Sequence, residues 1–286
     1  MNERANDKKT LRNIIIFSLI VLSCGWIGRL VDMKAGMDDN GSLGMLIWII
    51  SPLLTMVILR AFMGDGWKDF GIKPNLKGNI LLYFVSIFFF PILAAILILI
   101  GHHMKWLDEA NLSSSFLAAF GMALIPAFIK NIFEEFAWRG YLAPKLYSIG
   151  SNRLFFHICV GLIWGAWHIP YTFVIMHTTE SMITFIPRML IGVAALSIVF
   201  GEIWIMTRSV WPALIMHTAG NSVLDTLFLK NYLVVPKAYE YLVMPTSGVI
   251  PIVVTLLVGF WLYRRNTKTY KKESSGGYSP VKYTVK

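Results

Sequence analysis

The chain has 286 residues, of which 56% are hydrophobic and 15% are charged, and its formal net charge at pH 7 is +10. An ordinary soluble domain carries about 25% charged residues, so this composition excludes a typical soluble protein and predicts an all-α, polytopic membrane helical bundle. The positive charge raises the alternative of a nucleic-acid-binding protein. The chain has no basic stripe interleaved with aromatic residues outside its apolar segments, which argues against nucleic acid as a partner.

Apolar runs of about 17 to 25 residues, the length that crosses a bilayer as a helix, recur along the whole chain. We predict eight transmembrane helices, at residues 13–31, 43–63, 79–100, 114–138, 155–176, 185–206, 211–229 and 248–264. The chain then divides into a cytoplasmic N-terminal segment (1–12), a transmembrane domain (13–265) and a polar cytoplasmic tail (266–286). The tail has too few apolar residues to fold alone, so we expect it to be disordered.

The first apolar run has an alternative interpretation. A basic N-terminus, the run IIIFSLIVL and then Ser23 and Cys24 resemble a lipoprotein signal. A lipoprotein normally continues with a polar tether, whereas here Trp26 and Ile27 extend the apolar run, so we expect an uncleaved first helix. The second cysteine, Cys159, also lies in a predicted helix, and a disulfide framework is not expected.

Charge placement predicts the orientation. Most of the 26 Lys and Arg residues share one side of the membrane if both termini are cytoplasmic. The opposite loops hold the acidic residues Asp32, Asp38, Asp39, Asp108, Glu109, Glu180 and Glu240. This is the positive-inside pattern, and it predicts a multi-pass protein of the cell membrane with both termini in the cytoplasm. The loop at 64–78, GDGWKDFGIKPNLKG, is expected to be a partly interfacial cytoplasmic connection.

The fourth predicted helix carries charged residues near its cytoplasmic end, in the stretch NIFEEFAWRGYLAP. An ionisable group inside a membrane helix costs about 2.5–3.5 kcal/mol and is usually retained for a function. At helical spacing Lys130 faces Glu134, and Glu135 faces Arg139, as i,i+4 neighbours. The simplest interpretation of this helix alone is two neutralised ion pairs and nothing more.

Two later helices add polar side chains at a similar depth. His168 occurs in LIWGAWHIP, and His217, Asn221 and Asp225 follow an i,i+4 rhythm. Such a stripe must face protein or water, because lipid cannot satisfy it. At 1.5 Å per residue, Glu134 lies about 15 Å, His217 about 12 Å and His168 about 22 Å from the cytoplasmic helix ends. These depths allow the side chains to meet in the inner half of the bilayer, which favours a catalytic site over isolated interhelical hydrogen bonds.

These motifs resemble those of the CPBP intramembrane proteases, which include the CAAX prenyl endopeptidases of the Rce type and bacterial bacteriocin-processing or immunity-associated relatives. EEFAWR is similar to the EExxxR motif, WGAWH to the FxxxH motif and HTAGN to the HxxxN motif. The similar core covers about residues 114–230. Trp164 occupies the position of the family's Phe, an exchange that we expect to alter packing more than chemistry.

The resemblance implies a glutamate-dependent endopeptidase without a cofactor, acting on a membrane-embedded or lipid-anchored protein or peptide. By similarity, the roles fall into three pairs: Glu134 and His168 activate water, His217 and Asn221 stabilise the oxyanion, and Glu135 and Arg139 support them. Membrane lipids and the anchored substrate are the expected partners.

Several alternatives stay open. Arg139 could instead bind a substrate carboxylate through its fork, and Lys130 either tunes Glu134 or extends toward the headgroups. Zinc is an alternative cofactor, because Glu134, His168 and His217 are residue types that ligate it, although the HExxH spacing is absent. A non-catalytic membrane scaffold or bacteriocin-immunity protein that modulates a partner is the alternative from another functional class.

Overall fold

The computed structural model describes residues 3–37, 41–107, 114–150, 152–175, 180–230 and 232–275, and these residues contain no β-strand. Of the acidic residues expected in the outer loops, Asp38, Asp39, Asp108 and Glu109 lie outside the described residues, whereas Asp32 is buried within the first helix. Seven helices in the described part are long and apolar enough to cross a membrane. The predicted all-α, polytopic membrane bundle is confirmed.

The elements follow the predicted order with two changes. They are α1 (Glu3–Ala35), α2 (Leu43–Ala61), α3 (Ile80–His103), α4 (Ser114–Ala137), η1 (Trp138–Leu142), α5 (Ala143–Ser148), α6 (Arg153–Ile175), α7 (Met182–Thr207), α8 (Trp211–Gly220), η2 (Asn221–Leu229), η3 (Lys237–Tyr239), α9 (Glu240–Val243) and α10 (Val249–Ser275). The fourth predicted helix continues through the π-helix η1 into α5. The seventh, 211–229, is helical throughout but changes from α-helix to the π-helix η2 at Asn221.

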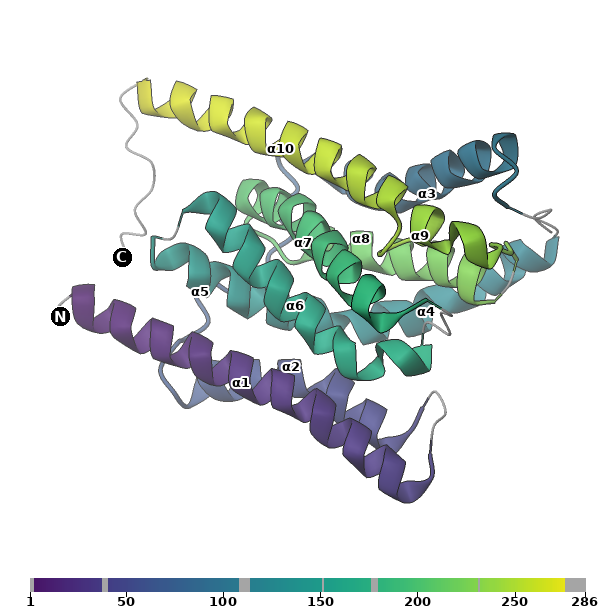
Figure 1. Ribbon diagram of the computed structural model, residues 1–286. Coiled ribbons are helices and arrows are strands. Elements are labelled where there is room, and N and C mark those ends of the chain that lie inside the picture. The colour runs from purple at the N-terminus through teal and green to yellow at the C-terminus, as the bar shows by residue number, and fades with distance from the viewer. Residues whose placement is uncertain are drawn as a thin grey trace.

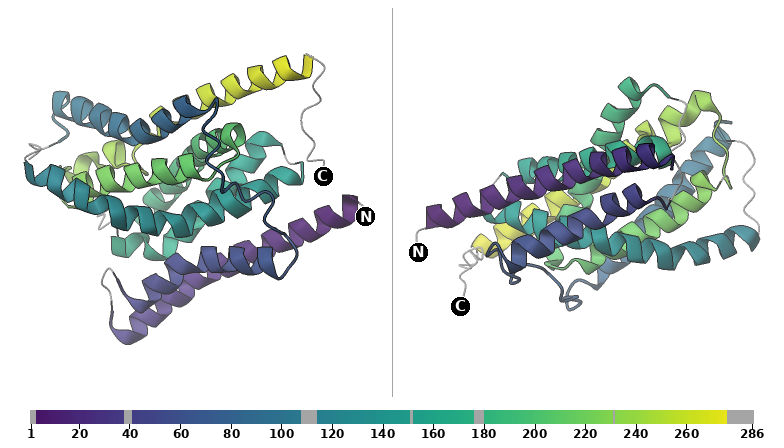
Figure 2. Two further views of the ribbon diagram at one scale, coloured as in Figure 1. Left: turned by 180° about the vertical axis from the view of Figure 1, so that it is seen from behind. Right: turned by 90° about the horizontal axis from the view of Figure 1, so that it is seen from below.

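The bundle has a central group of helices with a pair on each side. α4, α6, α7 and α8 lie in the centre, α1 and α2 pack on one side, and α3 and α10 lie on the other (Figures 1 and 2). α1 begins and α10 ends at the same end of the bundle (Figure 1). α10 continues to Ser275, beyond the predicted helix end at 264 and into the predicted tail, while residues 276–286 lie outside the described part.

Small residues let α1 and α2 approach closely. A Cβ added to Gly28 would lie 2.3 Å from the carbonyl oxygen of Gly44, and one added to Gly44 would lie 1.9 Å from that of Gly28. Both glycines are therefore required for this contact. Beside them the buried Asp32 accepts hydrogen bonds from Ser42 Oγ at 2.6 Å and from Tyr171 OH at 2.7 Å, which joins α1, α2 and α6.

An aromatic stack connects α2 to the helix that carries His168. The Trp48 ring stacks on Trp167 with centroids 4.3 Å apart and on Tyr171 at 4.7 Å. Trp48 Nε1 also donates to the Trp167 carbonyl oxygen at 2.7 Å. Because both α6 residues are buried near His168, this stack holds the face of α6 that carries His168 in register with α2.

A buried polar cluster attaches α10 to α6 and α7. Glu202 is fully buried and accepts hydrogen bonds from Arg153 Nε at 2.7 Å, from His157 Nε2 at 2.7 Å and from Asn266 Nδ2 at 3.0 Å. These three donors satisfy a carboxylate that lipid could not. Cys24 and Cys159 are both free thiols.

Candidate active site

The end of α4 departs from α-helical geometry just after the paired glutamates. Trp138–Leu142 form the π-helix η1, and regular α-helix resumes in α5. Single π-turns inserted in α-helices occur frequently at functional sites. All residues of η1 are buried, so the turn directs Arg139 into the protein and away from lipid.

Glu135 is fully buried and joins two of the motifs. Its Oε1 accepts hydrogen bonds from His217 Nδ1 at 2.8 Å and from Arg139 Nη1 at 3.2 Å. Arg139 Cζ also lies 4.3 Å from the ring centroid of Trp164 and 4.5 Å from that of Phe200. The expected i,i+4 pair is present, and the guanidinium is enclosed by protein and directed at Glu135.

Glu134 has other partners. Its Oε2 accepts a hydrogen bond from Trp164 Nε1 at 3.1 Å, and its Oε1 lies 4.0 Å from Lys130 Nζ. The Lys130 side chain keeps 39% of its surface exposed, so it stays near Glu134 while extending from the protein. Oε1 accepts no hydrogen bond from any described residue, and the Glu134 side chain is 1% exposed.

The Trp164 contact corrects one expectation. The exchange of the family's Phe for Trp was expected to alter packing more than chemistry, but the indole N–H makes a hydrogen bond to Glu134 that a phenyl ring cannot make. A hydrogen bond to a charged group contributes about 1.5–3 kcal/mol. The exchange therefore adds a polar contact to the predicted base.

His168 lies one turn after Trp164 on α6, and its Nδ1 is 2.8 Å from the Trp164 carbonyl oxygen. A carbonyl oxygen only accepts hydrogen bonds, so Nδ1 carries the proton and Nε2 of the neutral ring keeps its lone pair. His168 thus offers a basic nitrogen on the side away from its own backbone.

Asn131 is a site residue that the motifs did not identify. It is fully buried one turn before Glu135, and its Oδ1 accepts a hydrogen bond from Asn221 Nδ2 at 3.1 Å. This bond fixes the amide of Asn221 and connects α4 to η2. The only signal in the sequence is an asparagine inside an apolar helix, which by itself is ambiguous.

Side chains of the FxxxH and HxxxN motifs converge at a cavity of about 150 Å³ that is largely apolar. His168 and His217 face it from α6 and α8, and their rings lie 6.0 Å and 5.5 Å from the ring of Trp164. Its polar lining comes from Trp164, His168, Thr172, His217, Asn221, Asp225 and Thr246. The predicted meeting of the fourth, fifth and seventh helices is present.

Neither glutamate lines this cavity itself. Glu134 is connected to it through the indole of Trp164, and Glu135 through the ring of His217. Glu134 lies within electrostatic range of both histidines and of Lys130. The histidines and Asn221 therefore form part of the wall of the cavity, and the two glutamates form a buried layer behind it.

The donor geometry does not fit zinc. Among the described residues, no group of three or more His, Cys, Asp and Glu side chains is placed to hold a metal ion. Nδ1 of His217 donates to Glu135 and Nδ1 of His168 donates to a backbone carbonyl, and this leaves Nε2 of both rings free, as in metal-ligating histidines. The misfit is in the number of ligands, because two histidines without a third ligand beside them do not make a zinc site.

Residues 62–79, the strap between α2 and α3, pack against this site. Arg60, buried at the end of α2, donates to the Gly140 carbonyl oxygen in η1 and, at 2.7 Å, to Asp69 Oδ1 in the strap. A Cβ on Gly140 would lie 2.6 Å from the ring of Phe70. The strap therefore packs directly on the π-turn, with only glycine fitting at the contact.

The same strap also contacts the start of the helix that carries His217. Tyr141 OH donates to Asp65 Oδ2 at 2.7 Å on the η1 side, and Trp211 Nε1 donates to the Ile72 carbonyl oxygen at 2.6 Å on the α8 side. The loop was expected to be a partly interfacial connection. It is, in addition, a link between two elements of the site.

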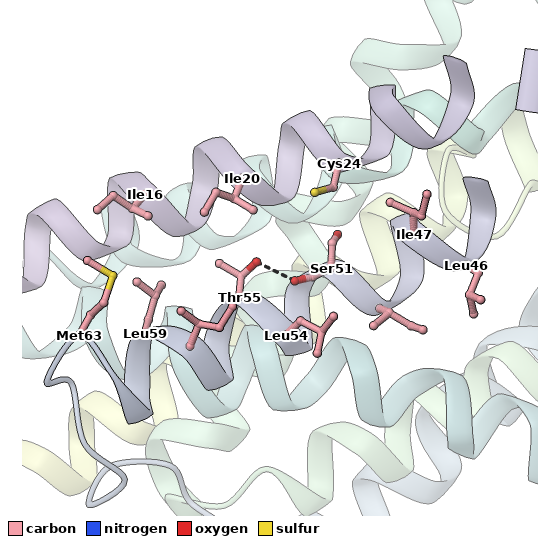
Figure 3. A pocket seen from close by; sticks show the side chains of 12 residues that line it. Ile16, Ile20, Cys24, Leu46, Ile47, Ser51, Leu54, Thr55, Leu59 and Met63 are labelled. Carbon is pink, nitrogen blue, oxygen red and sulfur yellow. Dashed lines mark hydrogen bonds between the residues drawn. The ribbon is translucent and has the colours of Figure 1, made fainter. Parts of the chain in front are cut away.

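A larger cavity of about 410 Å³ lies between α1 and α2 (Figure 3). Its lining is apolar apart from Cys24, Ser51 and Thr55, and Thr55 Oγ1 donates to the Ser51 carbonyl oxygen of its own helix at 2.7 Å. No carboxylate or imidazole faces it. It has the volume for an apolar chain but not the groups for hydrolysis.

The family model of type II CAAX prenyl endopeptidase Rce1-like proteins matches residues 114–223, from the start of α4 into η2. Over this core the chain is similar to the CPBP family of intramembrane proteases. The matched segment contains the EExxxR, FxxxH and HxxxN motifs and the part of the cavity wall formed by His168, His217 and Asn221. The strap precedes the matched segment and Asp225 follows it. No curated protein matches the chain.

Proposed function

We propose that this protein is a glutamate-dependent intramembrane endopeptidase of the cell membrane, cleaving membrane-embedded or lipid-anchored proteins or peptides. The observation that supports this most is the hydrogen bonding behind one cavity: Trp164 joins Glu134 to His168, Glu135 is bonded to His217, and both histidines line the cavity. Amide hydrolysis needs a base for water and donors for the developing oxyanion. These side chains provide both.

Glu134 and His168 are the proposed base pair. Glu134 Oε1, which accepts no hydrogen bond from a described residue, and the free Nε2 of His168 are the two atoms that we assign to accept protons from water. Trp164 holds both side chains, one through its indole N–H and the other through its carbonyl oxygen. General-base assistance of this kind contributes about 10²–10⁴-fold to a rate.

His217 and Asn221 are the proposed oxyanion donors. Because His217 Nδ1 already donates to Glu135, its Nε2 donates to the oxyanion only when the ring is doubly protonated, and the Glu135 carboxylate stabilises that cation. Asn221 Nδ2 uses one hydrogen on Asn131 and keeps the second for the oxyanion. Arg139 balances the charge of Glu135 behind the site.

The decisive experiment compares the wild type with Glu134→Gln in the cell that makes the protein. Glutamine is nearly isosteric but is not a base, so an uncleaved membrane protein should accumulate, and turnover should fall by at least about 10²-fold. Quantitative proteomics of native membranes measures the accumulation, and the variant protein should insert at the wild-type level. Wild-type processing by this variant would defeat the glutamate mechanism and favour a scaffold role.

A further inference from the structure

Two of the three carboxylates near the site lie close to a cationic side chain, and the third does not. Glu135 is bonded to Arg139, and Glu134 lies 4.0 Å from Lys130. The third carboxylate is Asp225 in η2, which lines the cavity. Three carboxylates thus share two permanent cations near the site, because Lys230, which also acts on Asp225, is exposed at the end of η2.

Asp225 has no close partner. Its carboxylate makes no hydrogen bond and no ion pair with any residue in the described part of the chain. Over longer distances it is attracted by Lys130, His217 and Lys230 and repelled by Glu134. A carboxylate in an apolar cavity is costly unless it is paired. The cavity therefore favours a ligand that brings a positive charge to this position.

The surroundings of Asp225 define the shape of that ligand. Asp225 follows Asn221 along the same lined face, and the cavity around it is formed by Leu224, Phe228 and Met244. Apolar walls around one carboxylate suit a side chain with an aliphatic stem and a cationic head. Lysine and arginine have this form, and a carboxylate in a pocket selects them in other peptidases.

We propose that Asp225 forms a subsite for the lysine or arginine side chain of a substrate, next to the bond that is cut. That the ligand is a substrate side chain rests on the proposed peptidase function. Its position one turn beyond Asn221 places the bound side chain within one or two residues of the carbonyl held by His217 and Asn221.

The binding test uses small cations and does not depend on turnover. Calorimetric titration of the full-length protein in detergent with n-butylguanidinium and n-butylammonium should give saturable binding, while n-butanol, the neutral analogue, should not bind. Asp225→Asn should weaken binding at least about tenfold, as expected for losing one partner of a desolvated charge pair. Asp225→Glu should retain it, and so should Glu134→Gln.

The cleavage test uses lipid-anchored quenched peptides that differ only in carrying Lys, Arg, Gln or Leu at one position. Wild type should prefer Lys and Arg at least about tenfold, and Asp225→Asn should lose the preference. Equal binding of butanol and butylammonium, or an unchanged preference in Asp225→Asn, would overturn the subsite. Binding of the cations without cleavage of any peptide would instead keep the subsite and reject the peptidase function.

Discussion

Trp164 links the two residues proposed to act on water, since its indole bonds Glu134 and its carbonyl bonds His168. Trp164→Phe keeps an aromatic ring but removes the hydrogen bond to a buried carboxylate, which contributes about 1.5–3 kcal/mol. We expect kcat to fall by about 10- to 100-fold with little change in KM, measured on a cleaved reporter peptide.

Trp204→Phe is the matched control for this change. Trp204 is equally buried, its indole N–H has no hydrogen-bond partner in the described part of the chain, and it does not line the cavity. Trp204→Phe should remove a similar amount of packing but leave kcat unchanged. Equal effects of the two substitutions would assign Trp164 a packing role only.

Metal dependence is also a question of individual side chains, because no third ligand stands beside the two histidines in the described part of the chain. EDTA or phenanthroline should leave cleavage by the purified protein intact, and elemental analysis should find less than one zinc per chain. One tightly bound zinc, with activity lost on its removal and regained on its return, would establish the zinc alternative instead.

At the scale of elements, the strap carries the most specific expectation. Arg60→Gln removes the guanidinium that bonds both Gly140 in η1 and Asp69 in the strap. Breaking a buried ion pair costs about 3–5 kcal/mol, so thermal unfolding in detergent should begin at lower temperature. Because η1 carries Arg139, kcat should fall even at temperatures where the variant stays folded.

Two comparisons make this prediction specific to the strap. Lys73→Gln removes an exposed strap cation and should change neither quantity. Arg60→Lys keeps the charge but not the fork that reaches two acceptors, so it should recover little of the lost kcat. Full activity of a folded Arg60→Gln variant would reduce the strap to a connecting loop.

How far the sequence predicts this site depends on the range of each contact. The Glu135–Arg139 pair follows from i,i+4 spacing, and so does the polar face of the helix with His217. The bond between Glu135 and His217 does not follow, because helical periodicity gives depth but not which helices are neighbours. The π-turns at Trp138 and Asn221 cannot be predicted from a 3.6-residue period either. In the sequence, Arg60 is only a positive residue at the end of a predicted helix, and nothing indicates its bonds to Gly140 and Asp69.

At the scale of the whole molecule, orientation remains a prediction from charge. α1 begins and α10 ends at one end of the bundle, as an even number of crossings requires (Figure 1). If that end is cytoplasmic, substrate enters from the cytoplasmic half of the bilayer. With Cys24 and Cys159 replaced by alanine, a cysteine at Met37 should react with a membrane-impermeant thiol reagent in intact cells, and one at Lys77 should not. The reverse pattern would invert the orientation and the side of cleavage.

The bond between Glu135 and His217 joins residues 82 positions apart in the chain. A ribosome adding about 5–20 residues per second needs about 4–16 s to cover that interval. For those seconds the EExxxR helix is already in the membrane without the histidine and asparagine that would hold an oxyanion. On the proposed mechanism each new copy passes through the insertion machinery, and past other unfolded membrane segments, before it can cut any of them.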